Sequence, residues 1–134
     1  MKTNNVPMIA AKFIGVHTQI EGKCFTFIKI VYEEAGLSID FYYQPVITSI
    51  DELSNSENIG KIIFLMRKGS DSYLFSHIAI IYDNYSVIHY SRRMNKECIY
   101  KVEISSFEEI LKVYDLVPNP YASSQNKKVK NPRL

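Results

Sequence analysis

An apolar stripe along one predicted helix constrains the fold of this chain more than any other feature. In residues 24–35, apolar side chains recur at the three- and four-residue intervals that bring them onto one face of an α-helix. The members of this stripe are Cys24, Phe27, Ile28, Val31, Tyr32 and Ala35. Gly22 precedes the helix at a sharp turn, and Gly36 follows it as a C-cap. The helix therefore buries one side, and Cys24 lies in its first turn at one end of the buried stripe.

The segments that follow this helix have the length and composition of β-strands. We predict strands over residues 62–66, 75–82, 87–91, 98–104 and 113–117. Short helices are predicted over residues 6–16 and over residues 107–111, where Ser105 or Ser106 would be the N-cap. Pro45 prevents a long helix between residues 38 and 58. Because helices come first and strands then follow one another, we predict an α+β fold with N-terminal helices packed on a central antiparallel sheet.

The length and charge of the chain limit its organisation and its partners. A chain of 134 residues supports one core, so we assign residues 1–120 to a single domain and residues 121–134 to a basic, flexible tail. The net charge of +2 predicts no nucleic-acid partner. Lys12 interrupts the only apolar run near the N-terminus, so we expect no signal peptide, and no stretch is long enough for a membrane span. We therefore expect synthesis in the cytoplasm, with association with a virion or export without a Sec signal as the routes elsewhere.

Cys24, His77 and His89 are the candidate catalytic residues. A cysteine attacks a carbonyl as the thiolate, and both the first turn of a helix and the neighbouring Lys23 favour a negative charge at Cys24. His77 begins a predicted strand and would act as the base, while His89 in the next strand would orient the His77 ring. Taken alone, each of these residues more often has a structural role. Their combination favours nucleophilic catalysis.

The loop between the two strands decides whether the two histidines lie on the same face of the sheet. His77 and His89 are an even number of residues apart. A loop with an odd number of residues, such as 82–84, would place the histidines directly opposite each other on one face. A two-residue loop made of Asp83 and Asn84 would direct them to opposite faces. We predict the odd loop, or a bulge with the same effect.

Two segments resemble the NlpC-type cell-wall peptidase family. The sequence GKCFTFI at residues 22–28 opens a helix similar to the nucleophile helix of that family, and HIAIIYDNYSVIHYS at residues 77–91 is similar to its pair of strands with the base and the third polar residue. The resemblance covers residues 13–102, and the short forms associated with phage tails are the most similar. It implies a papain-like fold, a Cys24-His77-His89 triad and cleavage of an amide bond in peptidoglycan stem peptides through a thioester.

The resemblance also indicates where substrate would bind. The family has a tyrosine before its cysteine, and Thr18 or Gln19 stands nearest to that position here, so one of them would help the backbone N–H of Cys24 to bind the oxyanion. Arg92 would bind a carboxylate of a peptide or cell-wall peptide substrate. The mechanism requires no metal or organic cofactor. Cys98 begins a predicted strand and is assigned no role. Cys24 and Cys98 could pair, but two cysteines do not make a disulfide framework, and each is interpreted as a free thiol. A zinc site is disfavoured because no closely spaced pair of ligands is present.

The residues that flank the nucleophile keep other functions open. Lys23 stands where the family has Asp, and Phe25 and Thr26 stand where it has Ser and Gly. These departures favour a catalytically weak binding or assembly module on the same fold, such as a phage tail component. The same triad would also serve a papain-like acyl transferase or lipid amidase, although the chain shows no hydrophobic anchor for a membrane. An open groove beside Cys24 would favour the hydrolase, and a thiol blocked by Phe25 would favour the module.

Overall fold

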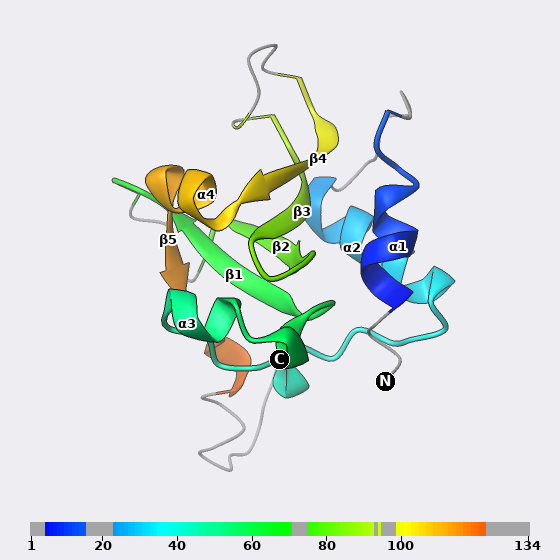
Figure 1. The fold of residues 1–134 in the computed structure, drawn as a ribbon, viewed down its shortest axis with the longest axis horizontal. Coiled ribbons are helices and arrows are strands. Elements are labelled where there is room, and N and C mark those ends of the chain that lie inside the picture. The colour runs from blue at the N-terminus through cyan, green and yellow to red at the C-terminus, as the bar shows by residue number, and fades with distance from the viewer. Residues whose placement is uncertain (1–4, 16–22, 71–74, 93, 95–98, 123–134) are drawn as a thin grey trace.

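Within the residues that the computed structural model describes (5–15, 23–70, 75–92, 94 and 99–122), a five-stranded sheet forms the centre of the molecule (Figure 1). The strands are β1 (Ile62–Arg67), β2 (His77–Ile81), β3 (Ser86–Ser91), β4 (Lys101–Ser106) and β5 (Tyr114–Val117). Their order across the sheet is β4-β3-β2-β1-β5, and every neighbouring pair is antiparallel. The predicted α+β class with a central antiparallel sheet is confirmed.

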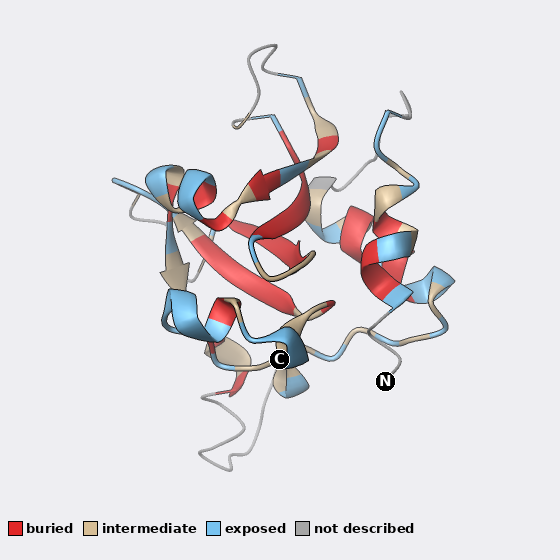
Figure 2. Ribbon diagram, in the orientation of Figure 1, coloured by how far each residue is buried: buried red, intermediate tan, exposed pale blue. Residues whose placement is uncertain are grey.

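Helices cover both faces of this sheet. The helices are α1 (Val6–Ala11), α2 (Lys23–Glu34), α3 (Ile50–Leu53) and α4 (Phe107–Val113), with 3₁₀ turns η2 (Phe41–Tyr43) and η3 (Ser56–Asn58). Buried side chains of α1 and α2 pack with Phe64, Ile80 and Ile88 on one face of the sheet. On the other face, α3 and α4 pack with Leu65 and Ile81. The central strands β2 and β3 are buried along their whole length for this reason, as Figure 2 shows.

The first helix is shorter than the prediction of residues 6–16. It ends at Ala11, with Lys12 as its C-cap. Phe13 still packs on the core, but Ile14 is 43% exposed and Gly15 has a φ of 83°. The positive φ of Gly15 is incompatible with a continued helix.

The boundary between β4 and α4 resolves the choice between the two predicted N-caps. Ser106 is the N-cap, and its side chain and that of Glu109 form a reciprocal capping box. Ser105 is instead a strand residue whose side chain is 3% exposed. The predicted strand over residues 98–104 corresponds to β4, which begins three residues later, at Lys101, and continues to Ser106. Cys98 lies outside the described residues.

The last described residues belong to the packed domain. The ring of Tyr121 stacks on Phe41 with a centroid distance of 5.2 Å, and Ala122 is 7% exposed. Asn119 ties this segment to η2 by donating hydrogen bonds to the carbonyl groups of Phe41 and Gln44. The rest of the predicted tail, residues 123–134, lies outside the described part. No helix in that described part is both long and apolar enough to pass through a bilayer.

Candidate catalytic site

The position of Cys24 follows from the way α2 docks on the sheet. Phe27, Ile28 and Val31 are fully buried on the sheet side of the helix. At the opposite end from Cys24, the Tyr32 hydroxyl donates a 2.6 Å hydrogen bond to the carbonyl of Gly60 just before β1. Cys24 occupies the second residue of α2 as a half-buried free thiol, as the sequence predicted. The apolar stripe thereby fixes one end of the helix, and with it the thiol, beside the sheet.

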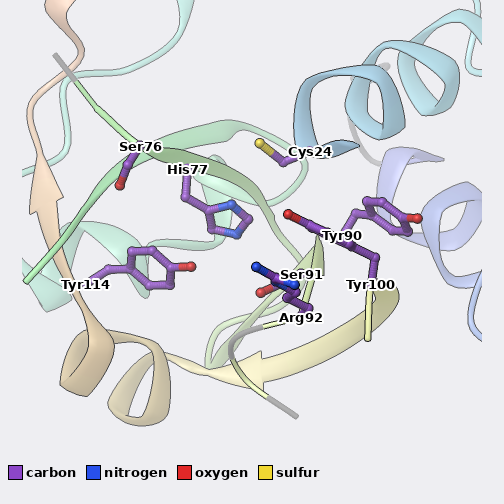
Figure 3. Close-up of a pocket in the computed structure, with 8 residues that line it drawn as sticks. All are labelled: Cys24, Ser76, His77, Tyr90, Ser91, Arg92, Tyr100 and Tyr114. Atoms are coloured by element: carbon purple, nitrogen blue, oxygen red, sulfur yellow. The ribbon is translucent and has the colours of Figure 1, made fainter. Parts of the chain in front are cut away.

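Cys24 and His77 line the same pocket. The pocket has a volume of about 210 Å³ and is lined by Cys24, Ser76, His77, Tyr90, Ser91, Arg92, Tyr100 and Tyr114. Figure 3 shows the sulfur of Cys24 and the imidazole of His77 directed into this space, one from α2 and the other from β2. Phe25 is absent from the lining and contacts the ring of Phe41 instead, at a centroid distance of 6.0 Å. The side chain of Phe25 therefore leaves the thiol open to the pocket.

The connection between β2 and β3 confirms the predicted odd loop. Ile80 pairs with Ile88, and the N–H of Tyr82 bonds the carbonyl of Ser86, so the loop comprises residues 83–85. Asp83 stabilises this loop by accepting hydrogen bonds from the Tyr85 N–H and the Ser86 hydroxyl. The loop is one residue later than the predicted example of 82–84. His77 and His89 consequently share a face as diagonal rather than directly opposite neighbours.

The two histidines are in direct contact. The Nε2 atom of His77 lies 2.7 Å from the Nδ1 atom of His89, and the two rings meet edge to face. On its other side the His77 ring stacks on Tyr114, with a centroid distance of 5.0 Å. Because Nε2 contacts His89, a proton exchanged with a thiol or a substrate would be carried by Nδ1 of His77. The contact between the two rings therefore fits the predicted roles, in which His77 is the base and His89 orients its ring.

Ser105 and Tyr114 are site residues that the sequence interpretation missed. The hydroxyl of Ser105 lies 2.9 Å from Nε2 of His89, so both ring nitrogens of that histidine are bonded. Tyr114, the first residue of β5, pairs with Arg67 on β1 and thereby reaches the His77 ring. The sequence contained a weak signal for Ser105: it is a small polar residue directly after the strand predicted over residues 98–104, although it was considered only as a helix cap. Tyr114 had no comparable signal.

Burial governs the proton affinities of the two most enclosed groups. Desolvation raises the pKa of the Cys24 thiol, while backbone N–H groups of Ile78, Phe25 and Cys24 lower it by a smaller amount. The net direction is therefore opposite to the sequence-based expectation that the helix end favours a thiolate at Cys24. Burial lowers the pKa of His89 well below its ordinary value, and the neighbouring His77 lowers it further. His89 is thus a neutral partner for His77.

This lowered pKa makes the stability of the protein depend on pH through His89. In the unfolded chain a histidine has a pKa of about 6.5, so below that pH the unfolded state binds a proton that buried His89 does not. The contribution of His89 is complete above pH 6.5 and decreases as the pH falls, by about 1.4 kcal/mol per pH unit. We expect the free energy of unfolding in urea, measured between pH 7.5 and 5, to fall with decreasing pH more steeply in the wild type than in His89→Gln. Equal slopes in the two proteins would mean that His89 accepts a proton in the native state.

The predicted substrate-binding residues have different outcomes. Arg92 does line the pocket, and its guanidinium carbon lies 5.4 Å from the centre of the Tyr100 ring. Among the described residues no carboxylate forms an ion pair with Arg92. Thr18 and Gln19, the candidates for the oxyanion site, lie outside the described residues.

The described residues contain no group of three or more His, Cys, Asp or Glu side chains arranged to hold a metal ion.

Searches of protein-family models, of curated proteins and of solved structures found no match to this chain.

Proposed function

We propose that this protein is a papain-like cysteine hydrolase that cleaves an amide bond in peptidoglycan stem peptides. One observation carries the proposal: Cys24 and His77 face the same pocket, while the far nitrogen of His77 is held at 2.7 Å by a fully buried histidine. A nucleophile, a base and a group that orients the base are the three parts that thiol catalysis requires. A histidine pair with only a structural role has no need of a pocket beside it. Here His77 lines a pocket together with Cys24, the only thiol among the described residues.

The proposed reaction uses the Nδ1 atom of His77. Nδ1 of His77 takes the proton of Cys24 as the sulfur attacks the carbonyl carbon, and the resulting oxyanion binds the backbone N–H of Cys24. This N–H is available because the first N–H groups of a helix have no partner within it. His77 then gives the proton to the leaving amine as the C–N bond breaks, which leaves a thioester on Cys24. A water molecule, deprotonated by His77, releases the carboxylic acid and restores the thiol.

The lining of the pocket supports a short, anionic peptide as the substrate. The guanidinium of Arg92 has no carboxylate partner among the described residues, and it lies on the aromatic ring of Tyr100 at the same pocket as the thiol. Arginine binds a carboxylate through two parallel hydrogen bonds. The pocket volume of about 210 Å³ is below the roughly 300–1,000 Å³ of sites that enclose a drug-sized ligand. A lipid amidase would need a longer apolar channel than this polar and aromatic lining offers.

The proposal predicts that the purified chain cleaves stem peptides and that the cleavage depends on its thiol. Mass spectrometry of synthetic stem peptides should reveal a new amine and a new carboxylate, and these products should be absent with Cys24→Ala. Amidation of the substrate carboxylates should slow the reaction if Arg92 binds one of them. Cleavage that persists in Cys24→Ala would show that the activity has another source.

A binding or assembly module is the second candidate, and the raised pKa of Cys24 favours it. Such a module would bind stem peptides through Arg92 and the tyrosines without turnover. Binding of intact peptide by calorimetry, together with no products after prolonged incubation, would select the module over the hydrolase.

A further inference from the structure

His89 is enclosed so completely that its protons must be assigned to specific partners. Its side chain is fully buried, between His77 on β2 and Ser105 on β4. Glu103 lies directly opposite it on β4, and Tyr114 covers the far side of His77. A neutral imidazole has one N–H donor and one acceptor nitrogen, so the two contacts of His89 cannot both be donations. The contact with Ser105 therefore determines which direction the contact with His77 can take.

Only one of the two tautomers of His89 is compatible with catalysis through His77. When His77 takes the proton of Cys24, both of its ring nitrogens carry hydrogen, and Nε2 becomes a donor. Nδ1 of His89 must then accept, so the single proton of His89 must reside on Nε2. That Nε2–H points at the hydroxyl oxygen of Ser105, 2.9 Å away. In the opposite tautomer His89 donates to Nε2 of His77, which leaves the His77 proton on Nδ1, where it prevents uptake of the thiol proton.

We infer that Ser105 is a positioning residue of the site, which stabilises the productive tautomer of His89 by accepting a hydrogen bond from its Nε2–H. A hydroxyl suits this position because its oxygen accepts a hydrogen bond without carrying a charge into the core. Without Ser105, the productive tautomer would leave an N–H donor unpaired at a fully buried position, which costs more than an unpaired acceptor nitrogen. The inference rests on the proposed function, because it assigns Ser105 a role in the same proton transfer.

The test compares Ser105→Ala with Ser105→Thr and with the matched control Ser86→Ala. Ser86 is also a buried serine of this sheet, is 7% exposed and bonds Asp83, but it does not contact either histidine of the pair. We expect Ser105→Ala to slow alkylation of Cys24 by iodoacetamide about tenfold at neutral pH and to shift its pH profile to higher pH. Ser105→Thr, which keeps the hydroxyl, and Ser86→Ala should remain within about twofold of the wild type. The alkylation rate of Glu103→Gln should also remain within about twofold of the wild type, since the carboxylate of Glu103 has no part in the proposed proton transfer from Cys24 to His77.

A second readout observes the tautomer itself. Nitrogen-15 NMR of histidine-labelled protein distinguishes protonation at Nε2 from protonation at Nδ1, and we expect Nε2–H at His89 in the wild type under conditions where the thiolate forms. In Ser105→Ala the Nδ1–H form should increase. The inference is wrong if His89 of the wild type carries its proton on Nδ1 under these conditions. It is also wrong if Ser105→Ala matches Ser86→Ala both in the alkylation of Cys24 and in the tautomer of His89.

The outcomes separate this inference from the proposed function. If Cys24 of the wild type reacts like an ordinary thiol with and without His77, the proposed function fails. If Cys24 is activated by His77 and Ser105→Ala leaves both the profile and the tautomer unchanged, only the role of Ser105 fails. Should Ser105→Ala not fold, the tautomer of the wild type and the rate of Ser105→Thr still decide the question.

Discussion

Replacing His77 by alanine is expected to lower the rate of amide hydrolysis about 10³-fold, within the range that general acid–base catalysis contributes. The reason is that burial raises the pKa of the Cys24 thiol, which disfavours the thiolate, so the proposed attack depends on a base that takes the thiol proton. The same variant should remove any rapid reaction of Cys24 with iodoacetamide below the ordinary thiol pKa of about 8.5. Rates against pH, read for each cysteine by mass spectrometry, measure this effect without knowledge of the substrate.

The alanine variant removes a buried ring, so its folding must be established separately. His77 is 6% exposed and stacks on Tyr114, and some loss of stability is expected from the cavity. Circular dichroism and the urea midpoint show whether His77→Ala is folded under the assay conditions. A folded variant that retains wild-type alkylation and hydrolysis would exclude His77 as the base.

Replacing Phe27 by alanine should produce the largest loss of stability among the changes proposed for this protein. Phe27 is fully buried on the face of α2 that contacts the sheet, where its ring meets Phe13 at 5.8 Å and Tyr90 at 6.4 Å between centroids. Truncation of a buried Phe costs about 3–5 kcal/mol, a large part of the roughly 5–15 kcal/mol that stabilises a domain. Urea unfolding followed by circular dichroism measures the change.

Phe25 provides the matched control on the same helix. It is 44% exposed and contacts mainly the ring of Phe41, so Phe25→Ala should cost about 1 kcal/mol or less. Because Phe27 also fixes the end of α2 that carries Cys24, its variant should lose hydrolysis even where it remains folded. Equal losses of stability in the two variants would contradict the packing of α2 described here.

Local patterns were sufficient to predict α2, α4, the five strands and much of the candidate site, but not α3 or the two 3₁₀ turns. The apolar stripe of residues 24–35 predicted α2 and the place of Cys24 in its first turn, because helical periodicity is a property of nearby residues. The even separation of His77 and His89 with an odd loop predicted that they share a face, because side chains alternate along a strand. The loop lies one residue later than predicted, so Ile80 pairs with Ile88 rather than with Ser86 and the register differs by two residues, since several turns are compatible with Asp83 and Asn84.

The tertiary structure alone decided the surroundings of these residues. Strand β5 pairs with β1 although β2, β3 and β4 lie between them in the sequence, and this pairing places Tyr114 on His77. The pairing of β3 with β4 likewise brings Ser105 to His89. Burial also reversed the expected direction of the Cys24 pKa, because desolvation depends on everything packed around the sulfur. The sequence by itself determined the candidate residues and the elements on which they lie. The long-range pairing of strands determined which groups surround these residues, because periodicity encodes the face of an element and not its neighbour.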